Sequence, residues 1–188
     1  MLSNFNNIPY QAHRFSLQEE IAYENSIRYM IILSLPLSLG PLTGHLGFPP
    51  FHAPFKINFD GVLFKDIYVV GLGVVVRKNQ GEVMGAMSEK ISLPYSMVDM
   101  EALACRKAVI FAWELSITET EVEGDSAMVI DFINSKGYCM VGCSHIIEDS
   151  WLAVLDFGSI YFSHVKRYGN FVAHHLAKTE KGLLKPLF

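Results

Sequence analysis

The feature that most constrains the fold is a strand pair followed directly by a long helix. Residues 69–77, VVGLGVVVR, are continuously apolar and rich in β-branched side chains, which predicts a buried strand. The turn KNQG (78–81) and the strand-like run 82–90 follow, so the two strands are expected to form a β-hairpin. Residues 96–115 then predict a helix with Ser96 as its N-cap. A hairpin that leads into a long helix requires a sheet with a helix packed on one face.

The flanking segments extend this pattern to an α/β domain. Three further strands are expected, one before the hairpin and two after the long helix, at 56–61, 118–125 and 159–167. The remaining helices are expected at 126–134, 146–157 and 170–178. Strands that are joined by a crossing helix run parallel. The order βββαβααβα therefore predicts a mixed five-stranded sheet flanked by helices.

The chain length suits one domain with an extension. We expect residues 54–188 to form the domain and residues 1–53 to form an N-terminal extension that ends in a proline-rich linker. Within the extension, residues 16–31 predict a helix. The most apolar stretch, 29–50, is interrupted by prolines, and a spanning helix needs about 20 uninterrupted apolar residues. No membrane partner is expected.

Composition limits the mode of binding. Hydrophobic residues make up 51% of the chain, which is enough for a sizeable core, and the net charge is −4. A negative charge argues against binding nucleic acid through bulk electrostatics, although a local basic patch remains compatible with it. The three cysteines predict a reducing, intracellular compartment, cytoplasm or nucleus, rather than a disulfide framework. A monomer is expected.

Three acidic residues occur where the predicted elements meet at one edge of the sheet. Asp60 closes the first strand and Asp125 closes the fourth, so parallel neighbours would bring both to the carboxyl edge. Glu101 lies on the long helix one turn before Cys105 and two before Ala108, a small-residue face suited to packing on a sheet. Each acid also has an ordinary explanation: Asp60 as part of an Asp-Gly turn, Glu101 as a solvated side chain and Asp125 as a helix cap.

Three carboxylates at one point repel one another unless a proton or a cation neutralises them. Sites built only from oxygen ligands select hard ions such as Mg²⁺ or Mn²⁺. Two such ions in one site activate a water molecule and stabilise a leaving oxygen in phosphodiester cleavage. The cluster therefore predicts a site for two ions of Mg²⁺ or Mn²⁺.

The ordered motifs carry a family resemblance. They are KINFDG, GLGVVVRKNQGEV, MEALACRKAV, VEGDSAMVIDFIN and FSHVKRYGNFVAHHLAK. Through these motifs, residues 56–178 resemble the ribonuclease H fold, and in particular the plant reverse-transcriptase-like ribonuclease H domains found alone or in retrotransposon-derived proteins. No single motif is specific, and the resemblance rests on their order across the domain.

The resemblance implies residue roles. The family's metal-binding carboxylates fall on Asp60, Glu101 and Asp125. Its fourth acid, four residues after an asparagine on the last helix, corresponds here to His174, four residues after Asn170. Either His174 assists the site, as a ligand suited to Mn²⁺ or as a proton shuttle, or it packs against apolar neighbours on its helix.

Other residues of these motifs are expected at the substrate, namely Asn58, Gly61, Ser126 and Asn170. Active members also carry a mobile histidine just after the fifth strand. The loop 166–170 offers Tyr168 instead, so this role is expected to be vacant.

Two functions follow from the resemblance. The first is a metal-dependent endonuclease that cleaves the RNA strand of RNA–DNA hybrids. The second is a catalytically weak or inactive module of retrotransposon origin that keeps the fold and binds nucleic acid or protein. The three acids favour the nuclease, whereas the missing fourth acid, the absence of a basic helix between the fourth and fifth strands and the unusual N-terminal extension favour the binding module.

Overall fold

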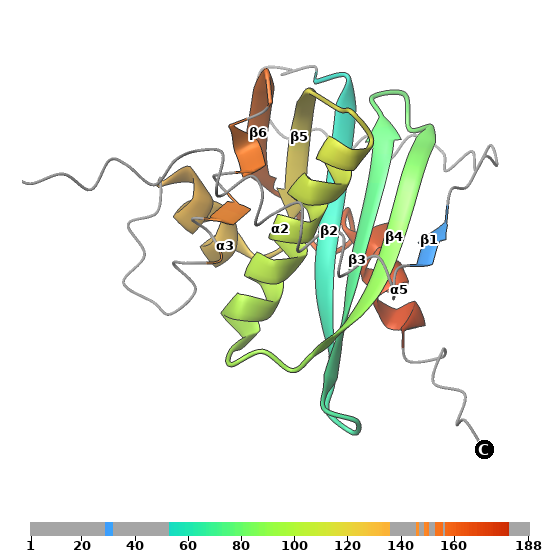
Figure 1. Ribbon diagram of the computed structural model, residues 1–188, viewed down its shortest axis with the longest axis vertical. Coiled ribbons are helices and arrows are strands. Elements are labelled where there is room, and N and C mark those ends of the chain that lie inside the picture. The colour runs from blue at the N-terminus through green and yellow to red at the C-terminus, as the bar shows by residue number, and fades with distance from the viewer. Residues whose placement is uncertain are drawn as a thin grey trace, which may run out of the picture.

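A computed structural model describes residues 29–31, 53–135, 146, 149–150, 153–155 and 157–180. Its centre is one sheet with the strand order β1-β4-β3-β2-β5-β6 (Figure 1). The strands are β1 Tyr29–Ile31, β2 Phe55–Phe64, β3 Val69–Lys78, β4 Val83–Ser92, β5 Glu119–Gly124 and β6 Ser159–His164. The pairs β2–β3, β3–β4 and β1–β4 are antiparallel, whereas β2–β5 and β5–β6 are parallel. The sheet is therefore mixed, as predicted.

Helices cover both faces of this sheet. They are α2 Met97–Glu114, α3 Ala127–Asn134 and α5 Phe171–Thr179. Figure 1 shows α2 crossing the face nearest the viewer and α5 on the opposite face. Residues 146, 149–150 and 153–154 are also helical, within the segment where a helix is expected.

The five predicted strands are all present, and a sixth was not anticipated. Residues 29–31 form β1, which pairs with β4, so the end of the helix predicted over 16–31 is wrong. Without β1, β4 would be an open edge whose unpaired backbone groups invite another strand. The rest of that prediction, and the linker at 46–52, lie outside the described residues. In the described part of the chain, no helix combines the length and the apolar character needed to cross a bilayer.

Helix α2 begins and packs as its sequence predicts. The Ser96 hydroxyl oxygen accepts a hydrogen bond of 3.0 Å from the backbone N–H of Asp99, which satisfies one of the free donors at the helix start. The small residues Cys105, Ala108 and Ala112 are completely buried. Their face of α2 therefore contacts the sheet closely and fixes the position of the first turn.

Helix α5 lies against β3 through two glycines. A Cβ atom added at Gly73 would stand 2.2 Å from the carbonyl oxygen of Ala173, and one added at Gly71 would stand 2.0 Å from that of Ala177. Real Cβ atoms do not approach oxygens so closely, so only glycine allows this contact between backbones. The Ser88 hydroxyl on β4 additionally donates to the carbonyl oxygen of Leu176 at 2.8 Å.

The acidic strand β5 is neutralised by neighbours on one face of the sheet. Lys56 Nζ lies 3.0 Å from Glu121 Oε2 and 2.8 Å from Glu123 Oε1. Asn58 Nδ2 donates to Glu123 Oε2 at 3.0 Å, and the Ser163 hydroxyl donates to Glu121 Oε1 at 2.8 Å. Burial lowers the pKa of Lys56, but the two carboxylates outweigh this effect and the net shift is upward. These contacts explain how a central parallel strand tolerates carboxylates.

We expect Lys56→Met to lower the free energy of unfolding at pH 7 by about 1–3 kcal/mol, since it leaves two partly buried carboxylates unneutralised. Urea titrations at pH 7 measure the loss. Lys65→Met, in the exposed turn after β2, serves as the control. Equal losses for the two variants would contradict the role given to Lys56.

Candidate metal centre

Asp60 lies within β2, where the pairing of this strand changes. The parallel register with β5 ends at Phe59 opposite Gly124, whereas the antiparallel register with β3 continues to Phe64. Asp60 is therefore the first residue beyond the end of β5, but it does not end its own strand. The expectation that the strand stops here is wrong, and so is the alternative of an Asp-Gly turn, because β3 supplies backbone partners for several more residues. The side chain of Asp60 is 3% exposed.

Gly61 allows α2 to approach β2. A Cβ atom at this position would stand 2.8 Å from Cγ of Met100, so the glycine makes room for a side chain of the helix. Its backbone N–H also donates to the carboxylate of Glu101. Gly61 thus supports an acid of the cluster through its backbone, and contact with a substrate remains a prediction.

Glu101 reaches the cluster from the first turns of α2. It lies one turn before the buried Cys105, on the side of the helix that faces the sheet. Among the described residues, its Oε2 atom is buried and has no hydrogen-bond partner. A buried carboxylate oxygen without a partner is costly, so the site retains an unused ligand atom.

Asp125 follows β5 directly and precedes α3, whose N-cap residue is Ser126. Its side chain is 7% exposed, and its Oδ2 accepts a hydrogen bond from Arg167 Nε at 3.0 Å. This contact with Asp125 raises the pKa of the Arg167 guanidinium. The guanidinium side chain is 77% exposed, so most of it remains open to solvent.

The structure brings the three predicted acids together. One carboxylate oxygen each from Asp60, Glu101 and Asp125 lies within 4.8 Å of the others, and the group could hold a metal ion. Burial raises the pKa of Glu101 to about 8, and the charges of Asp60 and Asp125 add to the effect. Burial also raises the pKa of Asp60, against the lowering influence of His174. Ionisation of Glu101 and Asp60 is therefore unfavourable here, and a cation bound beside them would neutralise the cluster.

His174 lies against the acids from α5. Its Nδ1 is 2.5 Å from Asp60 Oδ2, and the side chain is 23% exposed. The apolar contact of this helix with the sheet is made instead by Ala173, with Val172 and Leu176 beside it. Of the two arrangements considered from the sequence, the structure therefore has His174 at the acids rather than packed among apolar residues.

Asn170 anchors the start of α5 to β2. Its Nδ2 donates to the carbonyl oxygen of Phe59 at 2.7 Å, one residue before Asp60. The side chain is buried, and its Oδ1 has no hydrogen-bond partner among the described residues. Since His174 follows one helical turn later, this bond fixes where the imidazole meets Asp60.

The other residues expected at the substrate differ in accessibility. Asn58 is 1% exposed, and both ends of its amide are engaged, by Glu123 and by Arg77. Asn170 and Gly61 are also buried, so these three side chains are not presented on the surface. Ser126 is half-exposed next to Asp125 and remains accessible.

Sequence reasoning missed two residues beside the acids. Arg167 pairs with Asp125, as described above, and His164, the last residue of β6, has its Nε2 3.3 Å from the backbone oxygen of Asp125. The expectation of a vacant role concerns a histidine in the loop 166–170, and it stays a prediction, because His164 lies within the predicted strand. Both residues lie within the predicted strand 159–167, where the strand pattern alone accounts for them. The parallel register that pairs His164 with Gly124 brings them to the acids.

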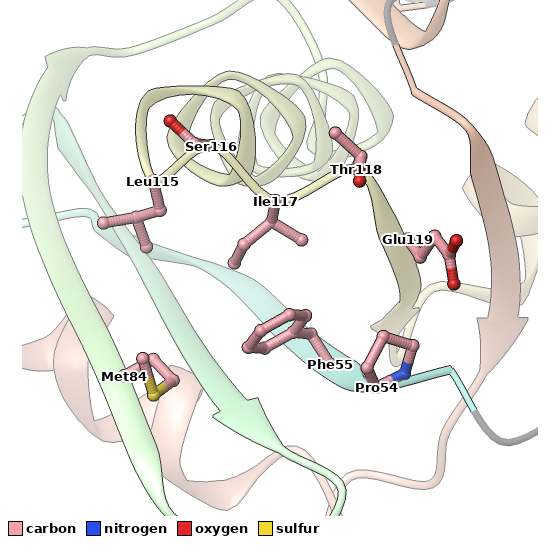
Figure 2. Close-up of a pocket in the computed structure, with 8 residues that line it drawn as sticks. All are labelled: Pro54, Phe55, Met84, Leu115, Ser116, Ile117, Thr118 and Glu119. Carbon is pink, nitrogen blue, oxygen red and sulfur yellow. The ribbon is translucent and has the colours of Figure 1, made fainter.

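A separate pocket lies at the opposite end of the parallel strands. It has a volume of about 230 Å³ and is bordered by the end of α2 and the starts of β2 and β5 (Figure 2). Apolar side chains, including Phe55, Leu115 and Ile117, face the hollow. The pocket contains none of the predicted site residues and is distinct from the acid cluster.

Comparisons with known proteins agree with this architecture. Residues 58–180 match the model of a family described as reverse transcriptase-like. The chain is similar to RNase H1 from the archaeon Halobacterium salinarum, with a TM-score of 0.63 and 18% identity over 68% of this chain and 97% of that one. It is similar to the N-terminal RNase H domain of a Mycobacterium tuberculosis protein fused to maltose-binding protein, with a TM-score of 0.61 and 20% identity over 68% and 92% of the two chains.

A third similar structure is LC11-RNase H1, isolated from compost and solved in complex with an RNA/DNA hybrid. Its TM-score is 0.52, with 18% identity over 69% of this chain and 99% of that one. The comparison with curated proteins gives no match. At these identities the similar structures show the fold alone, and they confirm the predicted ribonuclease H-like fold.

Proposed function

The chain belongs to the reverse transcriptase-like family, and from this membership and its acid cluster we propose that it is a metal-dependent endonuclease that cleaves the RNA strand of RNA–DNA hybrids. The observation that carries the proposal is the convergence of Asp60, Glu101 and Asp125 within 4.8 Å. The similar structures support the choice of substrate, since one of them holds an RNA/DNA hybrid.

In this proposal the three carboxylates would hold two ions of Mg²⁺ or Mn²⁺. The ions would supply an activated water and stabilise the leaving oxygen. The unpartnered Oε2 of Glu101 and the raised pKa values of Glu101 and Asp60 support a cation site. Oxygen-only ligands favour hard ions. Strand β2, which carries Asp60, pairs with β3 on one side and with β5 on the other, and this pairing holds Asp60 in place among the acids.

The remaining side chains around the acids have separate tasks in the proposed reaction. His174 hydrogen-bonds Asp60 and can hold or pass a proton at its Nδ1 atom. Arg167, largely exposed beside Asp125, is available to pair with a phosphate of the substrate. His164 lies beside the acids at the end of β6, with its Nε2 3.3 Å from the backbone oxygen of Asp125.

A specific observation also supports the second candidate, a weak or inactive binding module of plant retrotransposon origin. The family resemblance implies a fourth acid on the last helix, and His174 occupies that position. Residues 54–188 also contain 13 Lys and Arg against 16 Asp and Glu, a net charge of −3. Sequence-independent affinity for a nucleic acid depends on the number of phosphates neutralised, so such a module would bind weakly and lose affinity in salt.

Cleavage of a labelled hybrid distinguishes the two candidates. The nuclease should release short RNA products in Mg²⁺ or Mn²⁺, leave a DNA duplex of the same sequence intact, and stop when the metal is chelated. Discrimination between the two duplexes would rest on contacts with the 2′-hydroxyl groups of the RNA strand. Binding of the hybrid without products in either metal would reject the nuclease and retain the binding module.

Residue 174 provides a second test, through metal preference. If His174 completes the site, Mn²⁺ should support faster cleavage than Mg²⁺, because imidazole suits Mn²⁺ better. His174→Asp should shift the preference toward Mg²⁺, and His174→Ala should slow cleavage by about tenfold or more. Initial rates in the two metals measure this for all three proteins. Equal ratios of the two rates across the series would exclude His174 as a ligand.

A further inference from the structure

Exposed aromatic and basic side chains line the surface beside the acid cluster. Tyr168 is 67% exposed and Phe171 is 56% exposed. His175 and Lys178 follow Phe171 by four and seven residues, so the three share one exposed side of α5. We call this surface the α5 stripe; its members are Lys166, Arg167, Tyr168, Phe171, His175 and Lys178.

Two rings of the stripe are already arranged for stacking. The centroids of Phe171 and His175 are 3.9 Å apart, and their planes are inclined by 39°. His175 Nδ1 donates to the carbonyl oxygen of Phe171 at 3.1 Å, which holds the imidazole in place. Large exposed aromatic side chains have no role in packing the core, and fixed rings lose little conformational freedom when a planar ligand binds.

The stripe is continuous with the acid cluster. Arg167 reaches Asp125 at 3.0 Å, and His174 reaches Asp60 at 2.5 Å. The centroid of the His175 ring lies 6.1 Å from that of His174. A ligand on the stripe would therefore pass next to the carboxylates.

The charge of this segment is opposite to that of the chain. Residues 157–179 contain three Lys or Arg and no Asp or Glu, although the whole chain has 15 basic and 19 acidic residues. The stripe is thus a local basic surface on an acidic protein. Phosphate groups complement that charge, and each nucleobase offers a flat face to an aromatic ring.

We propose that the α5 stripe is a stacking platform for unpaired nucleotides of a single-stranded RNA or DNA segment. The proposal rests on the proposed function, and it narrows the substrate to hybrids that continue into a single strand next to the cleaved site. Tyr168 and the Phe171–His175 pair take the bases, while Lys166, Arg167 and Lys178 pair with the backbone. Stacking on exposed rings tolerates any base, so sequence selectivity is not expected.

The test measures binding without cleavage, with metal removed by a chelator. A fluorescently labelled blunt hybrid is compared with the same hybrid carrying a single-stranded extension of about five nucleotides, within the usual range of such sites. The extension should tighten binding to the unmodified protein. Phe171→Ala and Tyr168→Ala should each weaken binding of the extended hybrid by about 5- to 100-fold, the usual effect of losing one stacked base. They should leave the blunt hybrid unaffected.

Tyr68→Ala is the matched control, because Tyr68 is 74% exposed in the turn between β2 and β3, away from the acids. It should bind both ligands as the unmodified protein does. Lys178→Ala should lower the slope of affinity against salt, as the loss of one phosphate contact predicts.

The outcomes separate this proposal from the proposed function. Equal affinity for blunt and extended hybrids, or an unchanged affinity in Phe171→Ala, would overturn the platform; a protein partner would then be the better occupant of the stripe. If the platform is overturned but the protein still cleaves blunt hybrids, the proposed nuclease function is retained. Extension-dependent binding with no cleavage in either metal would retain the platform and reject the nuclease.

Discussion

Asp60→Asn is expected to slow hybrid cleavage by about 10³-fold or more, given that loss of even an outer partner of a metal ligand costs about 10- to 100-fold. The substitution keeps the shape of the side chain but removes the charge of the acid that contacts His174 and lies within reach of the other two carboxylates. Single-turnover cleavage of a labelled hybrid measures the effect, because it isolates the chemical step from product release.

Stability measurements keep this result interpretable. The metal-free Asp60→Asn protein should be at least as stable as the unmodified one, because the change removes a buried charge that raises the pKa of Glu101. Asp131→Asn, on an exposed part of α3, is the matched control and should cleave at the normal rate. A stable Asp60→Asn protein with normal cleavage would refute the metal centre.

The second large effect concerns pH and the metal-free protein. Burial, with the charges of Asp60 and Asp125, raises the pKa of Glu101 in the folded state to about 8, against 4.5 for an ordinary glutamate. Between these values the folded state holds a proton that the unfolded state has lost. The free energy of unfolding should therefore fall as pH rises from about 4.5 to 8, by on the order of 3–5 kcal/mol from this group. The raised pKa of Asp60 acts in the same direction.

Denaturant titrations across this pH range measure the slope. Glu101→Gln should remove most of it, because the amide does not titrate. Saturating Mg²⁺ should also flatten it in the unmodified protein, since an ion that binds only the folded carboxylates stabilises that state most where they are ionised. If the free energy of unfolding depends on pH equally in Glu101→Gln and in the unmodified protein, or if Mg²⁺ does not change that dependence, the coupling of these acids is contradicted.

The sequence predicted those features that depend on regular local patterns. The apolar run of β3, the small-residue face of α2 and the Ser96 cap each carry enough information to place an element and its buried side. Once these elements were ordered, the pairing rules for parallel strands brought Asp60 and Asp125 to one edge.

Features that depend on distant partners were not predictable in this way. The Asp-Gly pair in β2 favours a turn locally, and only the pairing with β3 keeps it extended. The contact of Arg167 with Asp125 joins residues 42 positions apart, and no local pattern distinguishes this arginine from a solvated one. Strand β1 likewise requires the edge of β4 and has no distinctive signal of its own.

The close contact between α5 and β3 has a consequence for how sequence variation in this protein should be read. Gly71 and Gly73 are not among the three acids or their partners, yet they determine how closely α5 packs on the sheet. Asn170 and His174 lie at the start and in the first turn of that helix, so a larger residue at position 71 or 73 would displace them from the metal centre. A mutational scan scored only by activity would then rank these two glycines alongside the carboxylates. A parallel measurement of the amount of folded protein would show that the glycines act through the packing of α5 on the sheet.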